Sequence, residues 1–290
     1  MKILLISIYF FSCISISNAS EIDDLTTPGQ VLKFIDTKIL PKGEGFRYSY
    51  DDSSYFGKNK FLKLDLDNNG YTDLLVRGFS ILIILDNKEH KYQLCQAKKY
   101  GDDPFQNNQL KDIISLTDTP VLIFDKSIDE YTRTMNGVLT ENKFLGRDSL
   151  IIKFGQLIEY NSSPDNFQIE NIKLSTTVCE GTCPEFKLSI NSQRNAEYSA
   201  IEYNDLKGNF KAKVDKESYN RLISTINYIK LNTLKKRYSV GVTDFPTYYL
   251  EIIYNNGNKK LIEDYGGDGT YGLKNLYSQL FKLRKNLNWK

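Results

Sequence analysis

The sequence predicts an α+β protein, in which a β-rich N-terminal domain is followed by an α+β domain with a mostly antiparallel sheet and two helices. Short apolar runs bounded by Asp, Asn and Gly fill residues 61–154 and are typical of strands. Two later segments carry apolar residues at helical spacing, and a hairpin lies between them. Roughly 270 residues follow the predicted leader, more than one core usually organises, so two domains are expected.

In the N-terminal half, Thr27 and Pro28 predict the start of a helix that ends near Pro41. Strands are expected at 61–64, 74–76, 81–85, 92–95, 121–124 and 150–154. Residues 161–166 are polar and rich in turn formers, which is typical of a linker. The predicted domains are therefore 20–163 and 164–290.

In the C-terminal half, strands are expected at 172–177, 186–190, 197–203 and 209–214. Asp215 predicts a helix N-cap, because apolar residues follow it at helical spacing. A hairpin is expected over 248–265, around the turn Asn255–Asn258. A final helix carries one apolar stripe that includes Leu273 and Leu280, which predicts a core-facing surface.

Residues 1–19 predict a secretory signal peptide: Lys2 precedes an apolar run, and Ser17 and Ala19 are the small residues before a cleavage point. The apolar run is shorter than the roughly 20 residues that span a membrane. A periplasmic or secreted protein that begins at Ser20 is expected. The alternative is a lipoprotein anchored through Cys13, because the residues before it resemble a lipoprotein cleavage box.

Composition excludes several function classes. A net charge of +2 with interleaved acids and bases gives no electrostatic reason to expect nucleic acid as a partner. His90 is the only histidine and lies in a polar turn, so a multi-histidine zinc site is excluded. The chain contains neither a G-x-S-x-G nor a Walker-type phosphate loop. After the leader, no segment approaches the length of a transmembrane helix.

The nonapeptide 65–73 has oxygen-bearing side chains at positions 1, 3, 5 and 9 and a glycine at 6, a spacing that lets a tight loop surround a hard cation. It resembles the calcium loops of integrin-type β-propeller repeats. That resemblance implies a Ca²⁺ ligand set of Asp65, Asp67, Asn69, the Tyr71 carbonyl and Asp73. Such an ion would be structural. The alternative is an acidic β-turn without metal.

Cys179 and Cys183 lie close together in the chain, and outside the cytoplasm such a pair predicts a disulfide, which leaves Cys95 as the odd thiol. The motif C-x-G-x-C-P around them precedes Asp244-Phe245-Pro246. In both respects the C-terminal half resembles an uncharacterised family of exported bacterial domains. The resemblance implies export and a domain that runs from about Ile172 to the C-terminus, but no activity.

Two functions are expected to compete. The first is a non-enzymatic envelope or secreted module that binds a protein or a glycan, because no catalytic signature is present. The second is a carboxylate-based hydrolase such as a glycosidase, with an acid–base pair drawn from four carboxylates near a glycine-rich stretch. These are Asp244, Glu263, Asp264 and Asp268. The binding module is favoured, and no catalytic residue is assigned.

Overall fold

A computed structural model of the 290-residue chain describes residues 20–40, 59–77, 81–87, 89, 91–96, 106–134 and 137–290. Within these ranges, the side chains of 96, 106–109, 127–134, 137–143 and 145 are not described. The predicted signal peptide with its alternative lipidation residue Cys13, and the single histidine His90, fall outside the described residues.

The first sheet is antiparallel, with the order β1-β2-β3-β4. Its strands are β1 (Phe61–Leu64), β2 (Asp73–Arg77), β3 (Ile81–Leu85) and β4 (Gln93–Gln96). Helix α1 (Pro28–Phe34) begins with a capping box at Thr27, continues into a π-helical turn (Ile35–Ile39) and covers one face of this sheet. Strands β2 and β3 are buried on both faces, which explains their unbroken apolar centres.

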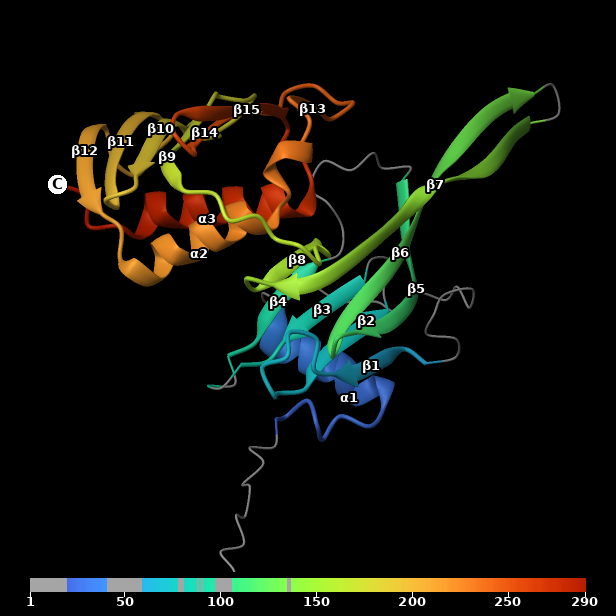
Figure 1. Cartoon of the computed structure of the whole chain (residues 1–290). Helices are drawn as coiled ribbons and strands as arrows, with labels where there is room; N and C mark the ends of the chain where they lie inside the picture. Colours follow the sequence, from blue (N-terminus) through green and yellow to red (C-terminus); the bar gives the residue numbers. More distant parts are fainter. Residues whose placement is uncertain are drawn as a thin grey trace, which may run out of the picture.

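The second sheet is also antiparallel and packs on the other face of the first, where Leu75 and Ile83 meet Phe124 and Leu150. Its strands, in spatial order, are β5 (Gln106–Leu116), β6 (Thr119–Thr134), β7 (Gly137–Lys153) and β8 (Gln156–Glu159). The paired ends of β6 and β7 extend past both neighbours as a two-stranded ribbon (Figure 1).

The third sheet has seven strands in the order β12-β11-β10-β9-β14-β15-β13. Only β13 runs parallel to its neighbour. The strands are β9 (Ile169–Thr176), β10 (Glu185–Asn191), β11 (Asn195–Glu202), β12 (Gly208–Lys213), β13 (Arg237–Ser239), β14 (Thr247–Tyr254) and β15 (Asn258–Tyr265). Helices α2 (Lys216–Tyr228) and α3 (Tyr271–Asn286) cover one face, and a short 3-10 turn (Leu231–Thr233) follows α2 (Figure 1).

The layers stack in the order α1, first sheet, second sheet, helix pair, third sheet (Figure 1). The second sheet contributes Val121 and Ile158 to the hydrophobic core of the C-terminal half. Polar bonds reinforce this contact. The Glu159 carboxylate accepts the backbone amides of Tyr271 at 2.7 Å and Gly272 at 2.9 Å, at the N-terminus of α3. The predicted domain boundary between residues 163 and 164 stays a prediction. The hydrophobic core of the C-terminal half includes residues from both sides of this boundary.

The predicted fold class, α+β with mostly antiparallel strands, is confirmed. Asp215 caps α2 as predicted, since its Oδ1 accepts the amide of Ser218 at 2.8 Å. Strands β5, β8 and β13 were not predicted, and β6 and β7 are much longer than their apolar centres. The sequence of β5 is largely polar, so its pairing with β6 leaves only a weak hydrophobic signal.

Cys179 and Cys183 lie at disulfide distance in the β9–β10 connection, with their Cα atoms 5.5 Å apart. The base of this loop is also held by Thr176, whose Oγ1 donates to the Pro184 carbonyl at 2.6 Å and accepts the Phe186 amide at 3.2 Å. Cys95 is free and buried, and burial raises its pKa to about 12.

Replacing both Cys179 and Cys183 with serine is expected to leave a folded protein with a modestly lower melting temperature. Closing so short a loop stabilises by about 2 kcal/mol on the chain-entropy estimate, and the Thr176 bonds persist in the variant. Peptide mapping without reduction should recover Cys179 linked to Cys183. Recovery of Cys95 linked to either residue would contradict this pairing.

Candidate metal centre

The acidic nonapeptide forms the tight connection between β1 and β2. The Asp65 carboxylate closes it, because Oδ1 accepts the amide of Asn69 at 3.1 Å and Oδ2 accepts the amide of Gly70 at 2.8 Å. Asn68 and Gly70 have φ values of 58° and 85°. Asparagine and glycine tolerate this left-handed region best, so the local sequence favours the turn.

Asp73 lies at the first position of β2 and is fully buried. Its Oδ2 accepts the amide of Leu66 at 2.8 Å, and its Oδ1 accepts the amide of Asp86 at 2.8 Å. The Asp86 carbonyl in turn accepts from Nδ2 of Asn69 at 2.7 Å. The residue that follows β3 therefore anchors the loop, and backbone donors fix the orientation of the Asp73 carboxylate.

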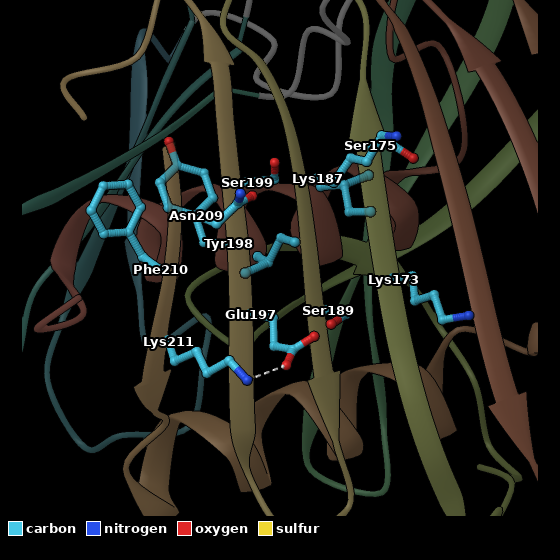
Figure 2. A pocket seen from close by; sticks show the side chains of 12 residues that line it. Lys173, Ser175, Lys187, Ser189, Glu197, Tyr198, Ser199, Asn209, Phe210 and Lys211 are labelled. Carbon is cyan, nitrogen blue, oxygen red and sulfur yellow. Dashed lines mark ion pairs between the residues drawn. The ribbon is translucent and has the colours of Figure 1, made fainter. Parts of the chain in front are cut away.

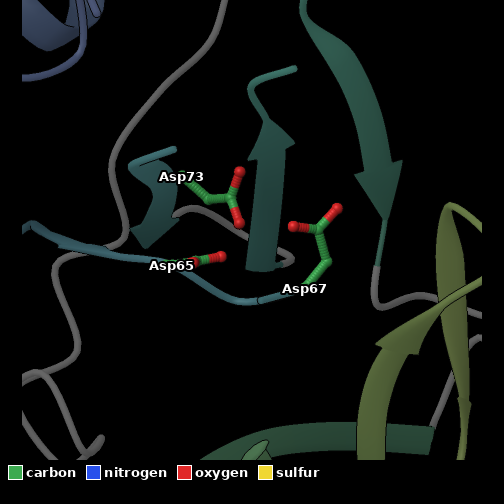
Figure 3. A group of neighbouring side chains, drawn as sticks. All are labelled: Asp65, Asp67 and Asp73. Carbon is green, nitrogen blue, oxygen red and sulfur yellow. The ribbon is translucent and has the colours of Figure 1, made fainter. Parts of the chain in front are cut away.

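The carboxylates of Asp65, Asp67 and Asp73 converge (Figure 3). Each offers one oxygen, and these three oxygens all lie within 4.8 Å of one another. Oδ1 of Asp67 is buried and has no hydrogen-bond partner within the described part of the chain. Converging carboxylate oxygens of this kind suit a hard divalent cation such as Ca²⁺.

The electrostatics of the three carboxylates also favour a bound cation. Burial, together with the charge of Asp65, raises the pKa of Asp67. Burial raises the pKa of Asp73 to about 7, although the amides of Asp86 and Leu66 stabilise its charged form. Three neighbouring carboxylates disfavour one another's ionisation, and a bound divalent cation would relieve that repulsion.

Of the five predicted ligand residues, the structure brings the three aspartates together. Oδ1 of Asn69 accepts the amide of Tyr71 at 2.7 Å, so the asparagine side chain lies within the loop with one lone pair already engaged. The anchoring role of Asp86 was missed, because it lies 13 residues beyond Asp73 and acts through its backbone. Metal ligation by this set stays a prediction.

The carboxylates of the hydrolase hypothesis are arranged differently. Glu263 and Asp264 are adjacent on β15 and face opposite sides of the sheet. Glu263 forms an ion pair with Arg237 at 3.0 Å, whereas Asp264 is fully buried and its Oδ2 accepts the amide of Gly269 at 3.1 Å. Asp244 is exposed, and its Oδ2 accepts from Thr243. A buried carboxylate such as Asp264 and an ion-paired one such as Glu263 are typical of structural roles.

The uncovered face of the third sheet carries several charged side chains (Figure 2). A shallow hollow of about 400 Å³ lies over β9–β12, where small serine side chains separate longer ones. Glu197 pairs with Lys211 at 3.1 Å, and Glu251 pairs with Lys173 at 2.7 Å. These two exposed ion pairs neutralise four of the charges on this face.

Comparisons with known proteins agree with the predicted uncharacterised domain. Residues 170–284 match a family model described as "Domain of unknown function (DUF6438)". The matched residues include nearly all of the third sheet and most of α3. That description carries no activity or ligand. No curated protein and no solved structure matches the chain. Within the described ranges, none of the helices combines the length and apolarity needed to cross a membrane.

Proposed function

We propose that the protein is an exported, periplasmic or secreted, non-enzymatic binding module that holds a structural Ca²⁺ in its acidic loop and binds a glycan or a protein. The observation that carries the metal proposal is the convergence of Asp65, Asp67 and Asp73 within 4.8 Å. Ca²⁺ is favoured over Mg²⁺ because the loop offers protein oxygens in an irregular arrangement, which the flexible coordination of Ca²⁺ accepts.

A binding role is supported by the burial and ion pairing of the carboxylates that the hydrolase hypothesis would use. Asp264 is fully buried and therefore not accessible to a substrate, and Glu263 is engaged by Arg237, so neither is placed as a general acid or base would be. A structural ion is supported by the position of the acidic loop, which joins two strands of the first sheet and is tied to the end of β3 through the backbone of Asp86. The ion would hold these segments together.

Export is supported by the environment of Ser20, the residue that follows the predicted cleavage point. Ser20 is buried, its backbone nitrogen donates to Oδ2 of Asp23 at 2.9 Å, and its Oγ accepts the amide of Ile22 at 3.1 Å. Cleavage after Ala19 would turn that nitrogen into an ammonium group beside a carboxylate, which strengthens the contact.

The mature protein is expected to begin at Ser20 and to carry no lipid. Intact-mass measurement on protein isolated from its own host checks this expectation. A mass that corresponds to a start at Cys13 with added acyl chains would establish the lipoprotein alternative instead.

Millimolar Ca²⁺ is expected to raise the melting temperature by roughly 4 °C relative to chelator, as for a site of extracellular affinity in a protein of this size. Asp67→Ala should abolish this rise, because it removes one of the three converging oxygens. It should not destabilise the metal-free protein much, because it also removes a repelling charge.

Asp118→Asn is the matched control. Asp118 is an exposed carboxylate beside the loop, whose backbone carbonyl accepts from Nδ2 of Asn68 at 3.0 Å, but it is not one of the converging groups. This variant should keep the full Ca²⁺ response. Equal melting temperatures in Ca²⁺ and in chelator for the unmodified protein would leave the acidic turn without metal as the correct interpretation.

A further inference from the structure

A polar cavity lies next to the acidic loop, between the second sheet and helix α2. Its volume is about 690 Å³. Five segments line it: residues 66–68 of the acidic loop, the β5–β6 turn, the end of β7 with its turn, residues 160–164, and α2. We call this cavity the loop–α2 pocket. Its size falls in the range of small-molecule sites.

The charges that line the loop–α2 pocket are Lys153, Arg221 and Asp67. Nζ of Lys153 lies 5.2 Å from the ring centroid of Tyr228 and 5.4 Å from that of Phe154, so two aromatic rings hold the ammonium group at the pocket wall. Neither Lys153 nor Arg221 forms an ion pair with another described residue. On the uncovered face of the third sheet, by contrast, Lys173 and Lys211 each pair with a glutamate.

The walls of the pocket are fixed by hydrogen bonds between segments that are distant in sequence. The Tyr228 hydroxyl accepts the amide of Asn161 at 3.0 Å, and Nδ2 of Asn161 donates to the Tyr228 carbonyl at 2.6 Å. Nδ2 of Asn68 also donates to the carbonyl of Asp118 and ties the acidic loop to the β5–β6 turn. A preformed pocket of this kind loses little entropy when it binds a ligand.

Uncharged polar groups complete the lining. Thr117, Thr119 and Ser162 contribute hydroxyl groups, and Tyr160 contributes a half-buried aromatic side chain. Hydroxyl groups suit the hydroxyls of a sugar, and the two cations suit an acidic substituent. The volume is far larger than a lone inorganic anion requires.

We infer that the loop–α2 pocket binds an acidic sugar, with a carboxylate or phosphate group placed between Lys153 and Arg221. This inference rests on the proposed binding function and names its ligand class. A Ca²⁺ ion bound at Asp67 would neutralise the one carboxylate among the described residues that line the pocket, so ligand affinity should be higher in Ca²⁺ than in chelator.

The test is an NMR titration of the ¹⁵N-labelled mature chain in Ca²⁺ with four probes: glucuronate, glucose 6-phosphate, glucose and inorganic phosphate. We expect saturable shifts around α2 and residues 153–162 with glucuronate or glucose 6-phosphate, and the probe that binds identifies the acidic group. Glucose and inorganic phosphate should bind at least roughly tenfold more weakly, since each lacks half of the recognised chemistry.

Arg221→Gln and Lys153→Gln should each weaken binding roughly tenfold, as expected for the loss of one charge-assisted contact. Both side chains are exposed, so the variants should fold. Lys216→Gln, at the exposed start of the same helix, is the matched control and should bind as the unmodified protein does. All of these variants should keep the Ca²⁺-induced rise in melting temperature, because none alters a converging carboxylate.

Three results would overturn the inference. The first is equal binding of inorganic phosphate and the acidic sugars, which would indicate a simple anion site. The second is the absence of binding by any probe, and the third is unchanged binding in Arg221→Gln and Lys153→Gln. If the Ca²⁺ response persists in these cases, the acidic-sugar site is rejected and the calcium proposal stands, whereas loss of the Ca²⁺ response alone would reject the calcium proposal.

Discussion

Replacing Glu159 with alanine is expected to lower the free energy of unfolding by about 3 kcal/mol, because two backbone amides lose a charged acceptor at a helix N-terminus. The carboxylate accepts the amides of Tyr271 and Gly272 from a strand of the second sheet. Gly272 permits this close approach: a Cβ there would lie 2.5 Å from Cγ2 of Ile229 and 3.3 Å from Oε2 of Glu159. Urea denaturation measures the change.

Glu251→Ala is the matched control for that measurement. Glu251 also makes a short charged contact, with Nζ of Lys173 at 2.7 Å, but on the solvent-facing side of the third sheet. Its loss should cost at most about 1 kcal/mol, as is usual for surface ion pairs. If Glu159→Ala were no more destabilising than Glu251→Ala, the capped contact between the second sheet and α3 would not contribute as described.

Replacing Asp264 with asparagine is expected to remove a pH-dependent loss of stability. Burial raises the pKa of Asp264 from 3.8 to about 6, although the Gly269 amide donates to it and the Tyr277 hydroxyl also favours its charged form. The folded state therefore holds this proton more tightly than the unfolded state. Stability is lost as pH rises from about 4 to about 6, by about 3 kcal/mol in total.

The measurement compares the free energy of unfolding of the two proteins at pH 4 and pH 7.5 in chelator. Asparagine can still accept from Gly269, so Asp264→Asn should gain about 2.4 kcal/mol relative to the unmodified protein between the two pH values. Asp73, whose pKa burial raises to about 7, titrates in both proteins and cancels in the difference. A difference that does not change with pH would contradict the account of this buried carboxylate.

Much of the secondary structure could be predicted from the sequence. Helix α2 with its Asp215 cap, helix α3 and the β14–β15 hairpin all follow from local periodicity and turn residues. Strand β5 could not be predicted, because it is largely polar and its pairing with β6 gives no local signal. The stacking of layers also escaped prediction, since strands buried on both faces do not show which element covers each face.

The candidate sites also include features that the sequence predicts and features that it does not. The convergence of Asp65, Asp67 and Asp73 was predicted, because all three belong to one nonapeptide with fixed spacing. The presence of both Lys153 and Arg221 in the lining of one pocket was not predicted. These residues are 68 positions apart in the sequence, and only the tertiary fold brings them to the same cavity. Local motifs are therefore visible in the sequence, whereas sites built from distant segments need the structure.

Calorimetric titration of the metal-free mature protein with Ca²⁺ tests the central claim most directly. The account predicts one binding site per chain in the unmodified protein and in Asp118→Asn, and no detectable binding in Asp67→Ala. Binding that survives Asp67→Ala unchanged, or no binding heat in the unmodified protein at millimolar Ca²⁺ and several temperatures, would contradict the assignment of the acidic loop as a calcium site.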